Sequence, residues 1–188
     1  MEETNTVNTL QEEALVVGIL SRIAGELGAM LGLEMELGAA RLERTRARPA
    51  GAGSIHVSFK LAFRAGARPE RSGCLLVPLA DAITLAGFLL MMSEDAVAAW
   101  REETMLETPL KNAMLEIGDM IASATASALL ELDLARWSVR SAGCQGVRAG
   151  IRPALPYVEG SELVVGRVAA RVGPFPAGEL VLVLPVLD

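Results

Sequence analysis

The sequence predicts a helix over about residues 108–130, and one face of it carries two carboxylates among small polar side chains. The polar positions recur at spacings of four, three, four and four residues, which places them on one face: Asn112, Glu116, Asp119, Ser123 and Ser127. Exposed helix faces usually carry Lys or Arg four residues from an acid, yet no cation lies between Asn112 and Ala135. Such carboxylates can bind a cationic group of another protein or accept a proton from water. A solvated acidic face without a role explains the same pattern.

Other constellations that could carry chemistry are missing from the sequence. His56 is the only histidine and falls on the polar side of a predicted strand without a nucleophile beside it, so we expect a solvated histidine and no catalytic triad. Cys74 and Cys144 have no metal-ligand spacing, and we expect free thiols, with a disulfide as the alternative. No glycine-rich nucleotide-binding pattern occurs. We therefore expect no metal and no cofactor bound by this chain alone.

Bulk composition predicts one globular domain over residues 1–188. Hydrophobic residues make up 52% of the chain and charged residues 21%, which is enough apolar material for a large core. The net charge of -6 argues against a duplex nucleic-acid partner, because such proteins carry a basic surface. The acidic N-terminal stretch lacks the features of a signal peptide, so we expect a cytoplasmic protein.

One apolar run, residues 75–92, is long enough to cross a bilayer. It contains Pro78 and Asp81 and has no flanking aromatic or basic anchors. A buried strand that ends at Pro78, followed by a buried helix, explains the run better than a transmembrane span. We therefore expect no membrane partner.

The remaining elements must position the acidic helix face. A first helix is predicted from Thr9 to about Leu31, with Thr9 and Glu12 as a capping box. Pro109 in the first turn fits a helix capped by Thr108. Strands are predicted at 55–63, 74–78, 162–172 and 179–187, and 33–48 is strand-like. The arginine-rich stretch 41–71 either docks an acidic partner or only solvates exposed strands.

A weak internal repeat relates the two halves of the chain. Residues 14–36 match 113–135 at an offset of 99, and "LVPLAD" (76–81) resembles "VLPVLD" (183–188). Chance matching of two Ala- and Leu-rich helices is the alternative. The repeat predicts an α+β fold in which each copy, about 9–80 and 108–188, reads helix, strand, strand, strand. The two long helices would then pack on one mostly antiparallel sheet.

The segment "LKNAMLEIGDMIASATASALLEL" resembles the signature helix of the CheC/CheX/FliY-type chemotaxis phosphatases. That family has an Asp or Ser four residues before a Glu and an Asn three residues after it. The resemblance implies a protein that binds a phosphorylated CheY-like response regulator and hydrolyses its phospho-aspartate. Glu116 would pair with the regulator's active-site Lys, Asp119 would occupy the water-orienting position, and Asn112 and Ser123 would contact the partner. The regulator would supply Mg²⁺.

This chain departs from the family pattern at two positions of the stripe. Asn112 replaces the leading Asp or Ser, and Asp119 replaces the Asn. An Asp about 4 Å from an anionic phosphoryl oxygen meets repulsion of roughly 4 kcal/mol at an effective dielectric near 20, or about a thousandfold in rate. Asp can instead accept a proton from the attacking water, which Asn cannot do. The alternative function is a non-catalytic interaction module related to flagellar-switch proteins.

The first repeat lacks the acidic pair. At an offset of 99, Val17 falls where Glu116 would be and Leu20 where Asp119 would be, which predicts a single site. Together with Val16 and Ala24, these residues give the first helix a broad apolar surface. Burial inside the monomer and burial in a homodimer explain that surface equally well.

Overall fold

The computed structural model describes residues 2–49, 54–104, 108–153, 155–156, 158 and 160–187, with the side chains from Leu10 onward. In chain order the elements are α1 (Glu2–Leu31), β1 (Met35–Leu37), β2 (Arg41–Thr45), β3 (His56–Ala65), β4 (Arg71–Pro78), α2 (Leu79–Leu89), α3 (Glu94–Trp100), α4 (Thr108–Glu131), β5 (Trp137–Val147), β6 (Leu163–Val172) and β7 (Gly178–Pro185).

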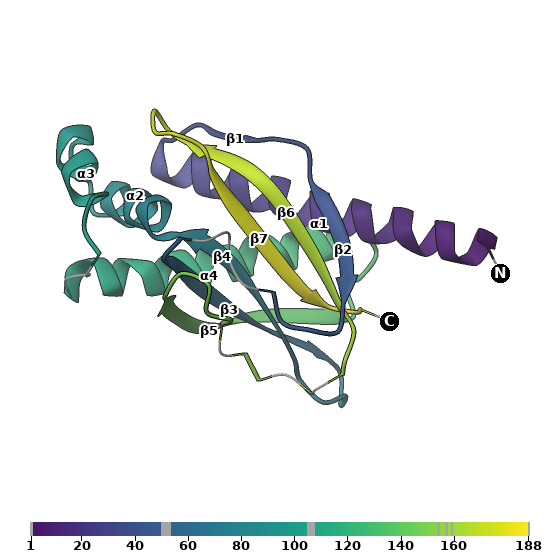
Figure 1. Ribbon diagram of the computed structural model, residues 1–188. Coiled ribbons are helices and arrows are strands. Elements are labelled where there is room, and N and C mark those ends of the chain that lie inside the picture. The colour runs from purple at the N-terminus through teal and green to yellow at the C-terminus, as the bar shows by residue number, and fades with distance from the viewer. Residues whose placement is uncertain are drawn as a thin grey trace.

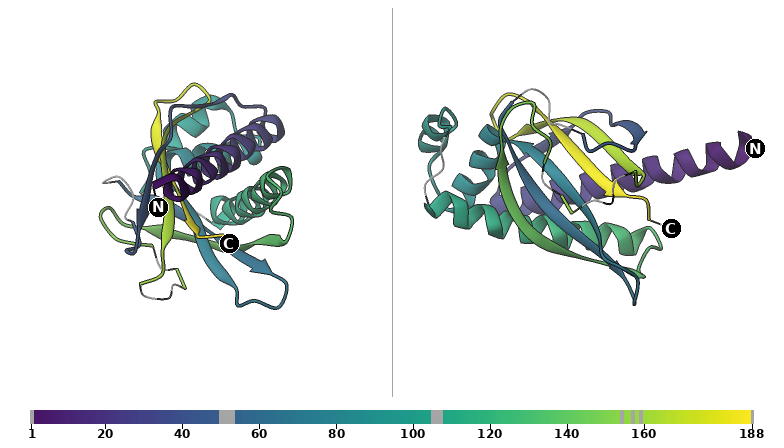
Figure 2. Two further views of the ribbon diagram at one scale, coloured as in Figure 1. Left: turned by 90° about the vertical axis from the view of Figure 1, so that its right-hand side faces the viewer. Right: turned by 60° about the horizontal axis from the view of Figure 1, so that its bottom comes forward.

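The described strands form one seven-stranded antiparallel sheet in the order β1-β6-β7-β4-β3-β5, with β2 also paired to β6. Helices α1 and α4 lie side by side against one face of this sheet (Figures 1 and 2). The shorter α2 and α3 lie near the start of α4 (Figure 1). The predicted α+β fold, with two long helices packed on an antiparallel sheet, is confirmed.

The centre of the sheet shows the two-fold character of the fold. In the pairing of β4 with β7, Leu75 lies opposite Leu182, and these two residues are 107 positions apart. Their neighbours pair symmetrically on either side, as Cys74 with Val183 and Leu76 with Val181. The pseudo-two-fold axis therefore passes between Leu75 and Leu182.

The flanking hairpins obey the same offset. His56 pairs with Pro78 in the β3–β4 hairpin, and Leu163 pairs with Pro185 in the β6–β7 hairpin, so both positions are shifted by 107 residues. Each repeat also lends a strand to the other: β2 pairs with β6, and β5 pairs with β3. The repeats interlock within one sheet.

Small residues in the sheet and helices set how closely the two layers approach. A Cβ built on Gly166 of β6 would lie 2.2 Å from Cγ1 of Val16 in α1. A Cβ on Gly118 of α4 would lie 3.5 Å from the ring of Phe59 in β3. Gly166 therefore lets the Val16 side chain reach the backbone of β6, whereas a Cβ on Gly118 would make only an ordinary van der Waals contact with Phe59.

Two local predictions were wrong. Helix α1 begins at Glu2, so Thr9 lies within the helix and does not cap it. His56 is 2% exposed and not solvated: Nδ1 contacts the Ser54 carbonyl at 3.1 Å, and Nε2 has no partner among the described residues. The second face of the sheet carries a smaller apolar cluster that includes Leu155 and Leu76, and Leu76 lies opposite Ser58, two residues from His56.

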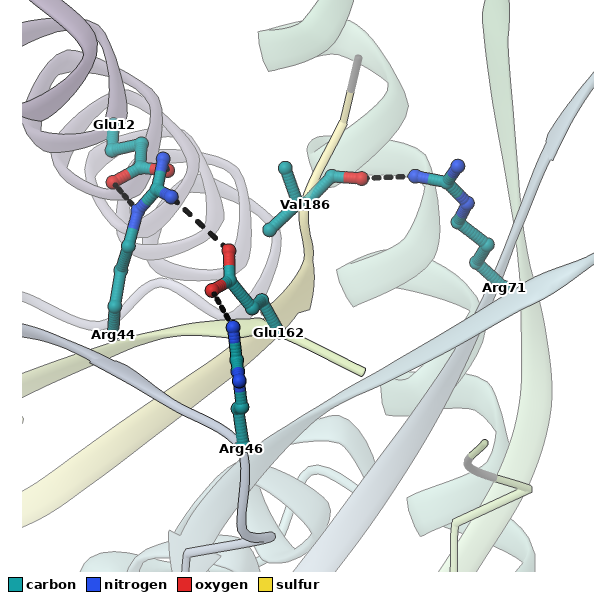
Figure 3. A network of polar contacts seen from close by, with 6 residues as sticks. All are labelled: Glu12, Arg44, Arg46, Arg71, Glu162 and Val186. Carbon is teal, nitrogen blue, oxygen red and sulfur yellow. Dashed lines mark hydrogen bonds and ion pairs between the residues drawn. The ribbon is translucent and has the colours of Figure 1, made fainter. Parts of the chain in front are cut away.

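The arginines of the 41–71 stretch are largely bound within the chain. Arg44 of β2 forms a bidentate pair with Glu12 of α1, at 2.6 and 3.0 Å, and a third contact with Glu162 at 3.3 Å. Arg46 contacts the same Glu162 at 3.0 Å (Figure 3). These groups tie α1 to β2 and to the start of β6. Arg41 and Arg46 remain largely exposed, so docking of an acidic partner by this stretch stays a prediction.

The apolar run 75–92 divides as predicted. Strand β4 ends at Pro78, α2 begins at Leu79, and the first nine residues of α2 are mostly buried. Two other helical segments, Leu10–Leu31 and Thr108–Glu131, are long and apolar enough to cross a membrane. Each of them buries one face in the core, and core helices pass the same test. Both cysteines are free, as predicted.

Candidate functional site

Helix α4 forms because its apolar residues recur at helical spacing and cover one side. Pro109 fits the first turn, where its missing N–H breaks no intrahelical bond. The buried side is made of Leu110, Ala113, Met114, Ile117, Gly118, Ile121, Ala122, Ala124, Thr125, Ala128 and Leu129. Because this side packs on α1 and on strands β3 and β5, the opposite side must face outward.

The polar stripe faces outward as the spacing predicts. Asn112, Glu116, Asp119 and Ser123 are exposed, and Ser127 is half-buried. Within the described part of the chain, no hydrogen bond or ion pair involves the carboxylates of Glu116 or Asp119. The structure therefore leaves both acids available to a group outside this chain.

The nearest helix does not neutralise the stripe. Arg22, the only cation of α1, donates to Glu26 at 2.6 Å and to Glu131 at 2.8 Å. Glu131 is the last residue of α4, several turns from Glu116. These two contacts raise the pKa of Arg22 and hold its charge at the far end of the helix pair.

A pocket of about 410 Å³ opens beside the stripe. Its wall is mostly apolar and comes from four elements, the segment before β3 and a connecting turn: Ile55, Val57, Leu79, Thr104, Lys111, Met114, Leu115, Cys144 and Gly146. Leu115 precedes Glu116 directly and is 47% exposed, so it belongs both to the pocket and to the outward side of α4. Lys111, also exposed, has no partner among the described residues.

Sequence reasoning found the stripe but missed the pocket. The stripe follows from the helical period within one segment, which a sequence displays directly. The pocket needs Val57 of β3 to lie opposite Gly146 of β5, and α4 to cross above both. The exposed Leu115 in an otherwise polar neighbourhood was the one local signal of this pocket.

The alignment of α1 with α4 that fits the structure is shifted by one residue from the predicted alignment. At an offset of 99 the buried Leu20 would correspond to the exposed Asp119. At an offset of 98 the pattern of burial in α1 matches that in α4, and the exposed Ser21 corresponds to Asp119. Gly18 then corresponds to Glu116. The first repeat lacks an acidic pair under either offset.

The broad apolar surface of α1 is explained mainly within the monomer. Val16 is 0% exposed, Leu20 2% and Ala24 7%, whereas Val17 remains 41% exposed. Three of the four residues that suggested burial on two sides thus pack into the core.

No protein-family model and no curated protein sequence matches this chain. Its structure, however, resembles several solved structures over most of its length. FliY from Thermotoga maritima has a TM-score of 0.64 at 14% identity, with 93% of this chain and 90% of that chain covered. A chain of the FliG–FliM complex from H. pylori has a TM-score of 0.66 at 10% identity, with 95% and 93% covered.

CheX from Desulfovibrio desulfuricans has a TM-score of 0.56 at 14% identity, and 90% of this chain and 96% of that chain are covered. The chain has the CheC/CheX/FliY fold. The resemblance of the 110–132 segment to the signature helix of that family is therefore supported at the level of the fold. In the CheC/CheX/FliY fold found here, the segment that resembles the signature helix is α4.

Proposed function

We propose that this protein is a cytoplasmic chemotaxis component that binds a phosphorylated CheY-like response regulator through α4. The observation that carries the proposal is the exposure of Glu116 and Asp119 on one face, with no partner for either among the described residues. A partner that binds such a carboxylate does not have to break an ion pair of the free protein first. The resemblance of the 110–132 segment and the CheC/CheX/FliY fold support this class of partner.

Glu116 is the docking carboxylate in this proposal. It would bind the Lys of the regulator's active site, and Asn112 and Ser123 on the same face would flank that contact. Charge-assisted hydrogen bonds gain strength when the interface excludes water. Glu116 therefore contributes affinity and fixes the register of α4 on the regulator.

Asp119 lies one turn further along and would enter the regulator's site next to the phosphoryl group. Catalysis of this kind is largely a matter of positioning, and the regulator would supply Mg²⁺. The negative charge of Asp119 opposes the approach of the phosphoryl oxygens, while its oxygens can accept a proton from the attacking water. We therefore assign a weak phospho-aspartate phosphatase activity.

The test is the decay of a phosphorylated CheY-type regulator with and without this protein. We expect faster decay with the wild-type protein, and weaker binding of the regulator by the Glu116→Ala variant. Glu13→Ala is the matched control, because Glu13 is an exposed glutamate of α1 near the other end of the helix pair. Unchanged regulator affinity in Glu116→Ala would remove Glu116 from the interface.

A non-catalytic switch-type module is the second candidate. Two observations favour it: Asp119 stands where the family has Asn, and a chain of the FliG–FliM complex matches at a TM-score of 0.66. This candidate predicts binding to a flagellar or chemotaxis protein without faster decay of the phosphorylated regulator. The same decay measurement therefore separates the two candidates.

A further inference from the structure

The pocket beside α4 shares a residue with the acidic stripe. Leu115 lines the pocket and lies between Asn112 and Glu116 along the exposed side of the helix. A protein that binds Glu116 can therefore also reach Leu115 at the pocket. Ile55, on the opposite rim, is 36% exposed, so apolar side chains face solvent on both sides of the opening.

The ion pair of Glu116 can supply only part of the affinity for a regulator. Exposed ion pairs contribute little net free energy, because the charges are well solvated before they meet. Stable interfaces instead depend on a few apolar side chains that fill pockets, with charges arranged around them. The pocket next to Glu116 has the shape and the lining for such an anchor.

We propose that this pocket takes an apolar side chain of the regulator that docks on α4. The inference rests on the proposed function and adds that this pocket helps determine which partner binds. Lys111 lies on the rim without a partner among the described residues, and Glu116 lies on the other side of Leu115. The complementary surface therefore presents a cation for Glu116, an aliphatic or aromatic side chain for the pocket and an acidic group for Lys111.

Cys144 lines this pocket and reports on its occupancy. The other cysteine, Cys74, is fully buried, and burial raises the pKa of its thiol to about 12, so it does not compete for reagent. Burial also raises the pKa of Cys144, and labelling is therefore done with N-ethylmaleimide at mildly alkaline pH. A beryllofluoride-activated CheY-type regulator with Mg²⁺ is the probe, and a saturating amount should slow labelling of Cys144 by about tenfold.

Gly146 offers a way to fill the pocket without touching the acids. It lies opposite Val57 across the β3–β5 pair, and a Cβ built on it meets nothing within 4 Å. Gly146→Leu should therefore fold, place its side chain in the pocket and weaken regulator binding by about tenfold or more. Gly25→Leu on α1 is the matched control, since its Cβ position is also open, and it should leave affinity unchanged.

The possible outcomes distinguish a failure of the pocket inference from a failure of the proposed function. If the wild-type protein binds the regulator but Cys144 stays as reactive as before, the pocket is empty in the complex and the inference is overturned. Equal affinity of Gly146→Leu and wild type has the same meaning, and both results leave the proposed function standing. Protection of Cys144 by high protein concentration alone would identify a second copy as the occupant. If the regulator does not bind at all, the proposed function and the inference both fail.

Discussion

Arg101, just after α3, donates from Nη1 to the carboxylate of Asp81 in the first turn of α2 at 3.1 Å. The two side chains are only 12% and 2% exposed, and the same guanidinium lies 4.4 Å from the ring centroid of Phe175. This buried pair fastens α3 to α2, from which the chain leads on to α4.

Loss of this pair should destabilise the whole protein. We expect Arg101→Ala to lower the free energy of unfolding by about 3–5 kcal/mol, because Asp81 would remain buried without its cation. Urea denaturation measures the change. Arg140→Ala is the matched control, since Arg140 pairs with Glu70 at 2.8 Å on the exposed surface, and it should cost at most about 1 kcal/mol. Equal losses in both variants would contradict the account.

Asp81 should also make stability depend on pH in a particular direction. Burial raises the pKa of Asp81, and this effect outweighs the opposing hydrogen bond and charge of Arg101. The folded state then holds the Asp81 proton more tightly than the unfolded state, so the stabilisation is complete below the unfolded pKa and is lost as pH rises through the folded pKa. The free energy of unfolding of wild type minus that of Asp81→Asn should therefore fall as pH rises above the ordinary range of Asp. A difference that grows with pH would reverse the assignment.

The contact between Gly166 and Val16 sets the spacing of α1 on the sheet. Because a Cβ at Gly166 would lie 2.2 Å from Cγ1 of Val16, we expect Gly166→Ala to cost about 1–3 kcal/mol of unfolding free energy. Val16→Ala in the same chain should recover part of that loss, since it removes the colliding methyl groups. Gly25→Ala, at an open position within α1, should instead stabilise by about 0.5–1 kcal/mol. Thermal or urea unfolding of the wild type and these three variants measures the changes in unfolding free energy.

What the sequence could predict was mostly local. The outward face of α4 follows from helical spacing, and the strands around Leu163–Val172 and Gly178–Pro185 follow from short apolar runs. His56 escaped prediction because a strand with one polar side normally leaves that side in water, whereas here His56 is buried and Leu76, on the same face, packs in an apolar cluster with Leu155. A covering segment without regular structure leaves no periodic signal in the sequence.

In the candidate site, too, only the local features could be predicted from the sequence. Glu116 and Asp119 were predictable because exposure on a single helix depends on spacing alone. The one-residue error in the counterpart of Asp119 arose because matching letters placed Leu20 there, although burial places Ser21 there. The pocket depends on the crossing of α4 over β3 and β5, and only tertiary structure sets that relation.

Asp119 is the position where chemistry and binding can be separated. Asn has the shape of Asp without the charge, so Asp119→Asn removes repulsion toward an anionic phosphoryl group. If the decay of the phosphorylated regulator is limited by that repulsion, the rate in the complex should rise, by up to about a thousandfold. Single-turnover decay at saturating protein gives this rate separately from affinity, and Ser123→Ala on the same exposed face is the control for altered docking. A large loss of rate in Asp119→Asn with unchanged affinity would mean that the carboxylate acts as a proton acceptor, and the electrostatic argument would then be wrong.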